Sequence, residues 1–515
     1  MAFYSILYPT REKAEAPAES QAECFKDLNL GQVFDYIFKA RVEYSLETYY
    51  FVPLQDAESV YYRQAVLREL ENPQHAAVVA GFSSLVYMQG SILQSVHDSF
   101  DSAETWRNNY LTRGQLLDSA ERYCAAIDHF ANSIMPIEFE SEGLRAFKGY
   151  VDDYRRGAEF KELLAHAKRI RDKLSEVQYV MHIKEGKIRV KKYDGEREFS
   201  ESITGLFDKF RQGETNDYAS VMPDVPDAPQ VEAQVLDMVA SYYKEAFNEL
   251  DTFCRKYYNF IDETLLRFSR EIQFYLGWNE LIAPLREQGL PFCYPKVAQG
   301  KDKIFVSEGY DLALAYKRHG EGIVTNDFEL NYPERLIMLT GPNQGGKTTF
   351  TRAFGQTHYV AALGLSVPGR DAALFLFDRI LSHFGSEEDL NTQSGQLQSD
   401  LYRLKAIYAR ATDRSLILIN EIFSSTTLAD ALPLGRHMME AIRKIGGPSV
   451  VVTFLDELYD ESPQVVSMMS LVNPEEPGAR SFKIVRKPPD GMAFALYIAA
   501  RHGLTYDQLQ VRFGK

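Results

Sequence analysis

The order of apolar and polar residues predicts two long helical stretches at the start of the chain. Apolar positions recur at helical spacing from Phe25 to about Val96 and again from about Ser102 to Lys173. Breaks fall around Pro53, before Pro73 and near Pro136. The residues before Phe25 are mostly polar and hold no predicted core.

The period then changes from that of a helix to that of a strand. Val177, Tyr179, Met181 and Ile183 alternate with mostly polar neighbours, and after a turn at Gly186 the alternation resumes with Ile188 and Val190. Two period-2 runs around a glycine turn predict a β-hairpin. Lys187, Arg189 and Lys191 fall on one face of its second strand, with Lys184 and Lys192 beside them.

A further helix is predicted at about 198–211, followed by a proline-rich loop. From Gln230 to about Gly277 the chain has no proline or glycine until its end. If helical throughout, it would span about 70 Å at roughly 1.5 Å per residue. This length favours an arm of long helices that carries the hairpin. From Phe292 onward strands and helices alternate, which is typical of an α/β domain.

The apolar run Leu336–Leu339 predicts a buried strand that ends in Gly-Pro-Asn-Gln-Gly-Gly-Lys-Thr. This matches the phosphate-binding pattern G-x-x-x-x-G-K-[ST]. Its glycines let backbone N–H groups surround a phosphate, and a helix from about Thr348 would point its positive end there. The predicted nucleotide-binding residues are Gly341, Pro342, Asn343, Gln344, Gly345, Gly346, Lys347, Thr348 and Thr349.

Lys347 supplies a charge for the β- and γ-phosphates, and the Thr348 hydroxyl is placed to ligate Mg²⁺. The alternative is a chance match in a glycine-rich turn, against which the strand before and the helix after both argue. The ligand predicted is ATP with Mg²⁺.

A second apolar strand, Leu416–Ile419, ends at Asn420 and Glu421. A nucleotide hydrolase needs a metal-organising group and a carboxylate that activates water at such a strand end. Glu421 is the candidate general base, with Lys347 as a second catalytic residue, and Asn420 and Glu421 join Thr348 as candidate metal ligands. The alternative interpretation of Glu421 is a surface carboxylate at the end of a strand.

Composition bounds the class of protein. A length of 515 residues predicts two to four domains. The formal net charge of −15 is not typical of a nucleic-acid binder, although an acidic protein can still carry a local basic surface. Four scattered cysteines fit a reducing cytosol, and the start of the chain does not have the pattern of a secretory signal. The uncharged stretch Ala76–Val96 contains several serines and glutamines, which favours a buried helix over a membrane span.

Taken together, the motifs from Asn326 onward resemble the MutS family. The resemblance rests on Gly341–Phe350, Phe377-Asp-Arg-Ile380, Asp389-Leu390, the polar stretch that leads to Asp400, and Asn420–Asp430, in the family's order. It reaches the N-terminal half more faintly, through Pro53-Leu54 and Tyr62-Arg63-Gln64. It implies a homodimer with ATP sites between the two ATPase domains, in which Ser394 or Gly395 faces the partner's nucleotide.

The resemblance also implies lever helices that end in a clamp on the DNA backbone. Lys187, Arg189 and Lys191 of the hairpin would then contact phosphates. A solvated edge strand carrying lysines is the alternative. Three departures count against a full mismatch-repair activity: no mismatch-reading domain is expected before the core, Asn420 replaces an aspartate, and Phe454 replaces a histidine. Neither a nuclease domain nor fast ATP hydrolysis is expected.

The sequence thus predicts a multidomain α and α/β protein: a helical core with long lever helices and a small β clamp, followed by a P-loop (ABC-type) α/β ATPase domain. The predicted segments are a polar 1–24, a core at 25–100, levers at 101–285, a return at 286–330 and the ATPase at 331–515. The predicted function is a cytoplasmic, ATP-gated DNA clamp that recognises branched or bent DNA and is not bound to a membrane. The alternatives are a nucleotide-switched protein scaffold and a transport ATPase.

Overall fold

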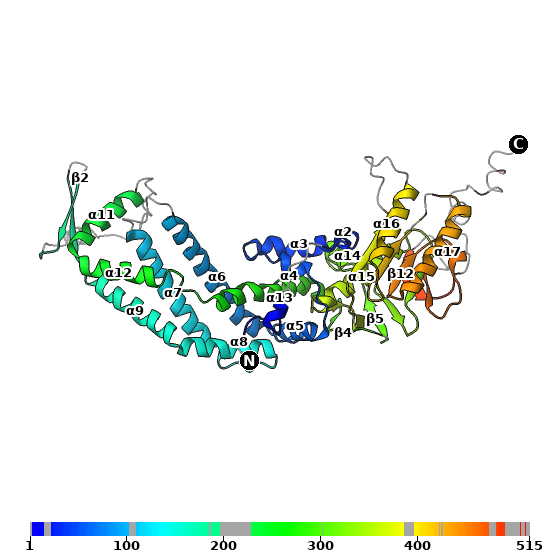
Figure 1. Cartoon of the computed structure of the whole chain (residues 1–515), viewed down its shortest axis with the longest axis horizontal. Coiled ribbons are helices and arrows are strands. Elements are labelled where there is room, and N and C mark those ends of the chain that lie inside the picture. The colour runs from blue at the N-terminus through cyan, green and yellow to red at the C-terminus, as the bar shows by residue number, and fades with distance from the viewer. Residues whose placement is uncertain are drawn as a thin grey trace, which may run out of the picture. The chain divides into compact units, whose positions relative to one another are not determined.

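The computed structural model describes residues 3–14, 22–101, 110–184, 187–195, 228–300, 302–385, 396–421, 423, 426–472, 480–489, 505 and 510. Contacts divide the chain into two compact units (Figure 1). The first comprises residues 1–3, 77–138 and 145–269, and the second comprises residues 4–76, 139–144 and 270–515. The chain is therefore mixed helical and α/β, with several sheets. The helix predicted at 198–211 lies outside the described residues.

The first unit is a bundle of helices with a hairpin at one end. Its elements are most of α6 (Pro73–Asp101), α7 (Tyr110–Ile134), α8 (Glu142–Arg156), α9 (Ala158–Ser175), β1 (Tyr179–Lys184), β2 (Lys187–Lys192), α11 (Ala228–Tyr242), α12 (Lys244–Lys256) and the start of α13 (Glu263–Glu287). Within it, the stacked rings of Phe82 and Phe130 lie 3.8 Å apart between centroids. The predicted breaks at Pro73 and Pro136 are confirmed, since α6 begins at Pro73 and α7 ends at Ile134.

Helix α6 contains the uncharged stretch examined in the sequence. Residues Pro73–Asp98 are long and apolar enough to cross a membrane by length and composition, a test that the core helix of a soluble protein also passes. Val79, Phe82, Val86, Leu93 and Val96 are buried at helical spacing. This stripe is typical of a helix that packs one face into a protein core.

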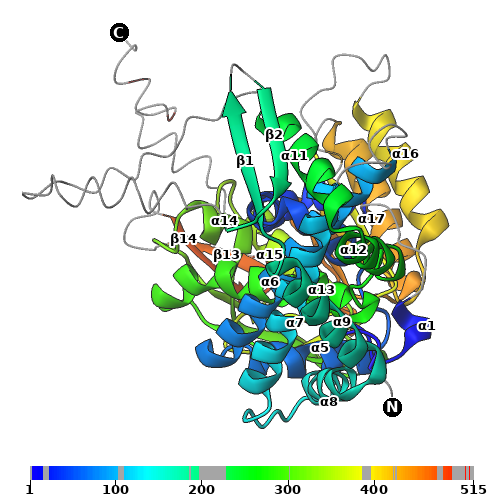
Figure 2. The same cartoon turned by 90° about the vertical axis from the view of Figure 1, so that its left-hand side faces the viewer.

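The hairpin is confirmed, with β1 and β2 antiparallel and Met181 opposite Val190 (Figure 2). The stretch after Gln230 is helical but not continuous. The chain forms α11, α12 and α13 instead, interrupted at Tyr243 and between Tyr257 and Asp262. Asp262 begins α13 as its N-cap, because its Oδ1 accepts a hydrogen bond from the Leu265 N–H at 2.9 Å.

The second unit contains a six-stranded sheet in the order β10-β11-β12-β7-β13-β14. Five of these strands are parallel and β14 is antiparallel to β13. The strands are β7 (Leu336–Thr340), β10 (Ile380–Phe384), β11 (Leu416–Asn420), β12 (Ser449–Val452), β13 (Val465–Val472) and β14 (Arg480–Arg486). The four strands at the centre, β11, β12, β7 and β13, are the most buried and rich in valine, leucine, isoleucine and methionine, as expected for parallel strands covered on both faces.

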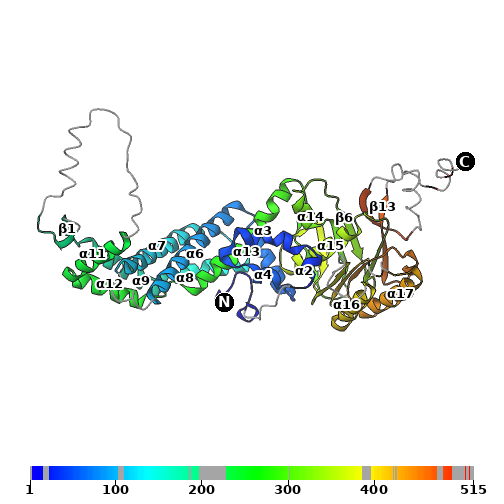
Figure 3. The same ribbon diagram turned by 90° about the horizontal axis from the view of Figure 1, so that it is seen from above.

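Helices cover both faces of this sheet (Figure 3). α16 (Gln396–Arg410) and α17 (Leu428–Ile445) share a hydrophobic cluster with one face of β7, β11 and β12. α15 (Lys347–Ala362) packs on the other face, where a Cβ added at Gly355 would lie 2.7 Å from a methyl carbon of Leu418. Only glycine permits this close approach of helix and strand.

Beside the large sheet lies a four-stranded sheet in the order β4-β9-β5-β6. Its strands are β4 (Lys296–Ala298), β5 (Ile304–Gly309), β6 (Asn326–Leu330) and β9 (Asp371–Phe375). The unit is completed by the pair β3 (Phe292–Cys293) and β8 (Val367–Pro368), the helices α1 (Arg11–Ala14), α2 (Cys24–Asp27), α3 (Leu30–Ala40), α4 (Glu47–Phe51), α5 (Ala57–Glu69) and α14 (Leu312–Lys317), and 3₁₀ turns at Val42–Tyr44 and Asp456–Leu458.

The expectation that the N-terminal segment adds nothing to a core is wrong. Ile6 and Leu7 are fully buried in the second unit. The Ile6 N–H donates to the Glu271 carboxylate at 2.9 Å, and the Tyr275 hydroxyl donates to the Ile6 carbonyl at 2.8 Å. Side chains of α13 thus satisfy the backbone hydrogen-bonding groups of Ile6. The pattern of residues near Ile6 cannot reveal such distant partners.

Arg63 is fully buried and ties this segment to the end of α15. Its Nε donates to the Leu7 carbonyl and its Nη1 to the Leu363 carbonyl, each at 3.0 Å. Its guanidinium also lies over the rings of Tyr8 and Phe274. One side chain thereby joins three segments that are distant in the sequence.

We expect Arg63→Met to lower the free energy of unfolding by roughly 2–4 kcal/mol, because two buried carbonyls lose their donors. Arg436→Met, at an exposed position of α17, is the control and should change it by less than about 0.5 kcal/mol. Urea unfolding followed by circular dichroism measures both. Equal stability of the two variants would contradict a structural role for Arg63.

Candidate phosphate-binding site

The predicted phosphate-binding loop connects β7 to α15, at the carboxyl edge of the parallel strands. Ligands of open α/β sheets bind at this edge. The backbone φ angle is 115° at Gly341, 61° at Gln344 and 92° at Gly346, so the loop curls through the left-handed region three times. The predicted strand, loop and helix are confirmed, with α15 beginning at Lys347.

Strand β13 holds the loop from one side. The Ser470 hydroxyl donates to the Gly345 carbonyl at 2.6 Å. A Cβ added at Gly345 would lie 2.3 Å from the Ser470 Oγ atom and 2.9 Å from the Pro342 carbonyl oxygen. No side chain fits at this position while the loop keeps its shape.

Lys347 is almost completely buried, and its ammonium binds backbone carbonyls at the start of the loop. Nζ donates to the Gly341 carbonyl at 2.8 Å and to the Pro342 carbonyl at 3.1 Å. Burial lowers the pKa of this ammonium below its usual value, and the Glu421 carboxylate 3.7 Å away offsets part of that shift. The loop therefore carries a cation whose charge is only partly compensated.

Two oxygen atoms converge beside Lys347. The Thr348 hydroxyl donates to the Asn420 Oδ1 atom at 3.1 Å, across from α15 to the end of β11. Hard divalent cations prefer such neutral and anionic oxygen donors, and Mg²⁺ keeps several of its waters. Thr348 and Asn420 thus offer oxygen donors of the kind that a magnesium ion takes, and the Glu421 carboxylate follows Asn420 in the chain.

Glu421 follows β11 in an unusual backbone conformation. Its φ is 58°, its N–H donates to the Val452 carbonyl at 3.1 Å, and its side chain is 34% exposed. Left-handed backbone at a residue other than glycine is uncommon and concentrates at functional sites. The carboxylate is thus accessible to water and adjacent to the loop.

Strand β12 ends at Val452 and brings Thr453 and Phe454 to the same edge. Thr453 is buried, and its hydroxyl accepts a hydrogen bond from the Leu455 N–H at 3.0 Å. The Phe454 side chain is 41% exposed and has no group that can polarise water.

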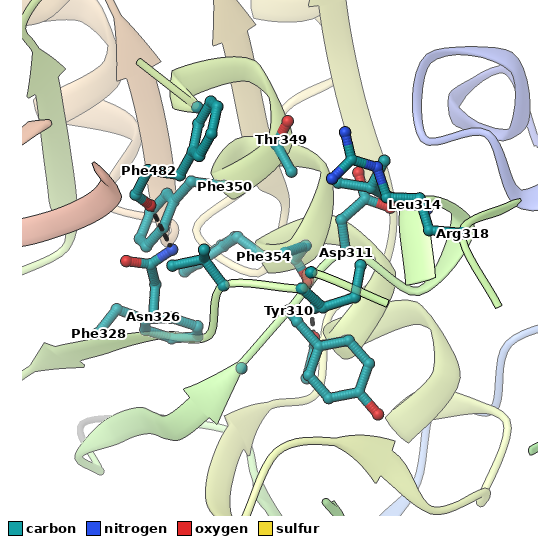
Figure 4. A pocket seen from close by; sticks show the side chains of 17 residues that line it. Tyr310, Asp311, Leu314, Arg318, Asn326, Phe328, Thr349, Phe350, Phe354 and Phe482 are labelled. Atoms are coloured by element: carbon teal, nitrogen blue, oxygen red, sulfur yellow. Dashed lines mark hydrogen bonds between the residues drawn. The ribbon is translucent and has the colours of Figure 1, made fainter. Parts of the chain in front are cut away.

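A cavity of about 240 Å³ adjoins the loop (Figure 4). Gly346 and Thr349 line it on the loop side. Leu314 of α14 and the flanking residues Tyr310, Asp311 and Arg318 also line it. Burial raises the pKa of the Asp311 carboxyl, which caps α14 by accepting from the Leu314 N–H. Several phenylalanines complete the wall, so the cavity suits a flat aromatic group next to a phosphate.

Phe482 on β14 is held over Gly346 by the amide of Asn326 (Figure 4). Asn326 Nδ2 donates to the Phe482 carbonyl at 3.1 Å, and its Oδ1 accepts from the Ile484 N–H at 2.8 Å. Phe482 takes a φ of 54°, and a Cβ added at Gly346 would lie 3.6 Å from its Cδ1 atom. Sequence reasoning quoted Asn326 for the resemblance alone and missed Phe482, for which no motif gives a signal.

The candidate DNA-contacting residues lie in the first unit. The register of the hairpin places Lys191, Arg189 and Lys187 on one face, with His182 opposite Arg189 and Lys184 opposite Lys187. Arg189 and His182 are exposed. Lys192 lies on the other face, and its ammonium is 5.0 Å from the centroid of the Tyr243 ring.

Val190 shares the face of Lys192 and is buried against α11 and α12, in a cluster with Val235, Val239 and Phe247. The hairpin thus has one face packed on helices and one basic face. Ser394 and Gly395, predicted to face a partner's nucleotide, lie outside the described residues.

Comparison with known proteins agrees with this geometry. Residues 337–502, which include the loop, β11 and β14, match the family model described as MutS domain V. These matches support a MutS-family protein.

The MutS-family relatives share moderate identity with the chain. DNA mismatch repair protein MutS of Thermotoga maritima is 25% identical over 278 residues, 53% of this chain and 33% of that protein. Endonuclease MutS2 of Thermus thermophilus is 29% identical over 205 residues, 39% of this chain and 27% of that protein. The aligned part of the chain thus covers between about a quarter and a third of the length of these curated relatives.

Gly345→Ala tests the packing of the loop without assuming a ligand. We expect it to lower stability by roughly 1–3 kcal/mol, because the added methyl overlaps Ser470 and Pro342. Gly31→Ala, in α3 with no heavy atom within 4 Å of the added Cβ, is the control and should be neutral or slightly stabilising. Thermal and urea unfolding measure both, and a neutral Gly345→Ala would contradict the packing of Ser470 on the loop.

Proposed function

We propose that this chain is a MutS-like, ATP-gated DNA-binding protein that acts as a homodimeric clamp in DNA repair or recombination and hydrolyses ATP slowly. The observation that carries the proposal is the loop between β7 and α15. Its buried Lys347, the Thr348–Asn420 pair and the adjoining cavity offer a cation, a place for Mg²⁺ and a place for a nucleobase. The match to MutS domain V supports the same assignment.

In the proposed complex, the backbone N–H groups of the loop and Lys347 bind the phosphates of ATP, and the base enters the cavity beneath Phe482. Thr348 and Asn420 would hold Mg²⁺, which would supply positive charge to neutralise the phosphates. Glu421 accepts a proton from the attacking water. The site forms part of a P-loop, ABC-type ATPase domain, and Ser394 or Gly395 of a second subunit completes it.

Two residues support slow turnover. Asn420 offers a neutral amide where a carboxylate would hold a metal-bound water more strongly. Phe454 offers no hydrogen bond to water or to the γ-phosphate. We infer that binding of ATP drives most of the motion, and that hydrolysis resets it.

DNA binding is proposed for the basic face of the hairpin. Arg189 is exposed there and Lys191 shares its face, while the opposite face is packed on α11 and α12. Contacts of this kind hold phosphates and carry no base information, which suits recognition of the shape of branched or bent DNA. The proposed location is the cytoplasm.

We expect the triple variant Lys187/Arg189/Lys191→Ala to bind DNA more weakly than the wild type. The slope of log affinity against log salt should fall by about 2–3, since each lost phosphate contact removes nearly one released counterion. Fluorescence anisotropy with linear and branched duplexes, with and without ATP, measures this slope.

The charge-matched control is Arg145/Lys161/Lys168→Ala, at exposed positions of α8 and α9. It should leave the slope unchanged. If the wild type binds no DNA at low salt, the clamp proposal is wrong. The alternative function is then a nucleotide-switched protein scaffold, which Phe454 favours because its side chain cannot assist ATP hydrolysis.

Glu421→Gln should lower the ATP hydrolysis rate roughly 10²–10⁴-fold while ATP binding is retained, because the amide cannot accept the proton from water. Glu440→Gln, on the exposed side of α17, should leave the rate unchanged. Release of inorganic phosphate measures turnover, and fluorescent nucleotide binding measures affinity. Unchanged turnover in Glu421→Gln would exclude Glu421 as the base.

A further inference from the structure

Strand β14 presents three cations along its length, and one of them differs from the others. Lys483 donates to the Thr325 carbonyl, and Arg486 forms an ion pair with Glu334. Arg480 has no ion pair or hydrogen bond among the described residues, although its Nη1 atom is buried. A buried guanidinium nitrogen without an acceptor is costly in a folded protein.

The register of the sheet places Arg480 next to the phosphate-binding loop. Arg480 pairs with Val472 of β13, two residues after Ser470, whose hydroxyl holds the Gly345 carbonyl. On the other side, β13 pairs with β7 up to Thr340, the last residue before the loop. Arg480 therefore lies at the same edge as the loop.

Arg480 is also close to the residues that surround the loop. The pairing of β13 with β14 is irregular between Ser470 and Val472, and Phe482, two residues after Arg480, turns through a φ of 54° and covers Gly346. The charge of Arg480 contributes to the lowered pKa of the Lys347 ammonium, so the two cations are close enough to repel each other. Glu421 is the carboxylate that faces Lys347 at this edge.

We propose that Arg480 is a phosphate-binding residue of the nucleotide site, contributed by the same subunit as the loop. The assignment rests on the proposed function, because its ligand is the phosphate chain of the nucleotide bound there. A polyphosphate supplies an anionic acceptor for the guanidinium, which has no ion pair among the described residues, and it relieves the repulsion between Arg480 and Lys347. Guanidinium groups suit this task because their planar donors match phosphate oxygens.

Arg480→Gln should weaken binding of ATP about 10- to 100-fold, the range expected for a lost charge-assisted hydrogen bond. Binding of adenosine, which lacks phosphates, should be unchanged, and ADP should show a loss as well. Isothermal titration with adenosine, ADP and ATP in the presence of Mg²⁺ measures the three affinities. Arg486→Gln, on the same strand, is the matched control and should bind ATP like the wild type.

Arg480→Lys keeps the charge and should lose less affinity than Arg480→Gln, which also provides a test if the glutamine variant does not fold. Equal ATP affinity in the wild type and in both variants would overturn the assignment of Arg480 alone. An equal loss for adenosine and ATP would also overturn it, since it would indicate a structural role. Absence of ATP binding by the wild type would instead overturn the proposed function.

Discussion

The candidate site depends on the central position of β7 in the parallel sheet. Because β12 and β13 both run parallel to β7, their carboxyl ends meet where β7 gives way to the loop. That pairing brings Thr453 and Ser470 to the loop, and β11 adds Asn420 and Glu421. Without this register the loop would have neither its hydrogen bond from Ser470 nor a carboxylate beside Lys347.

Local signals were enough to predict the parts of this site that are local in sequence. The apolar run before Gly341 and the motif that follows specify strand, loop and helix within sixteen residues. The second strand and its terminal Asn420 and Glu421 follow from the same logic. The proximity of Glu421 to Lys347 was foreseeable because parallel strands end at one edge, although the roles of both residues stay predictions.

Contacts between distant segments could not be predicted in this way. Asn326 and Phe482 are 156 residues apart, and only the folded sheets bring the amide to the backbone of Phe482. Arg63 likewise donates hydrogen bonds to the carbonyls of Leu7 and Leu363, which are distant from it in the sequence. The stretch after Gln230 has no proline or glycine to mark where its helices end, although the structure interrupts it at Tyr243 and starts α13 at the cap of Asp262.

Asn326 belongs to the four-stranded sheet, whereas Phe482 and Gly346 belong to the six-stranded sheet and its loop. The cavity beneath Phe482 therefore has walls from both sheets. A molecule that fills it contacts the two sheets at once and resists sliding of one against the other. Asn326 and Lys483 already join the two sheets beside this cavity, so its occupancy bears on how stiffly the unit resists shear.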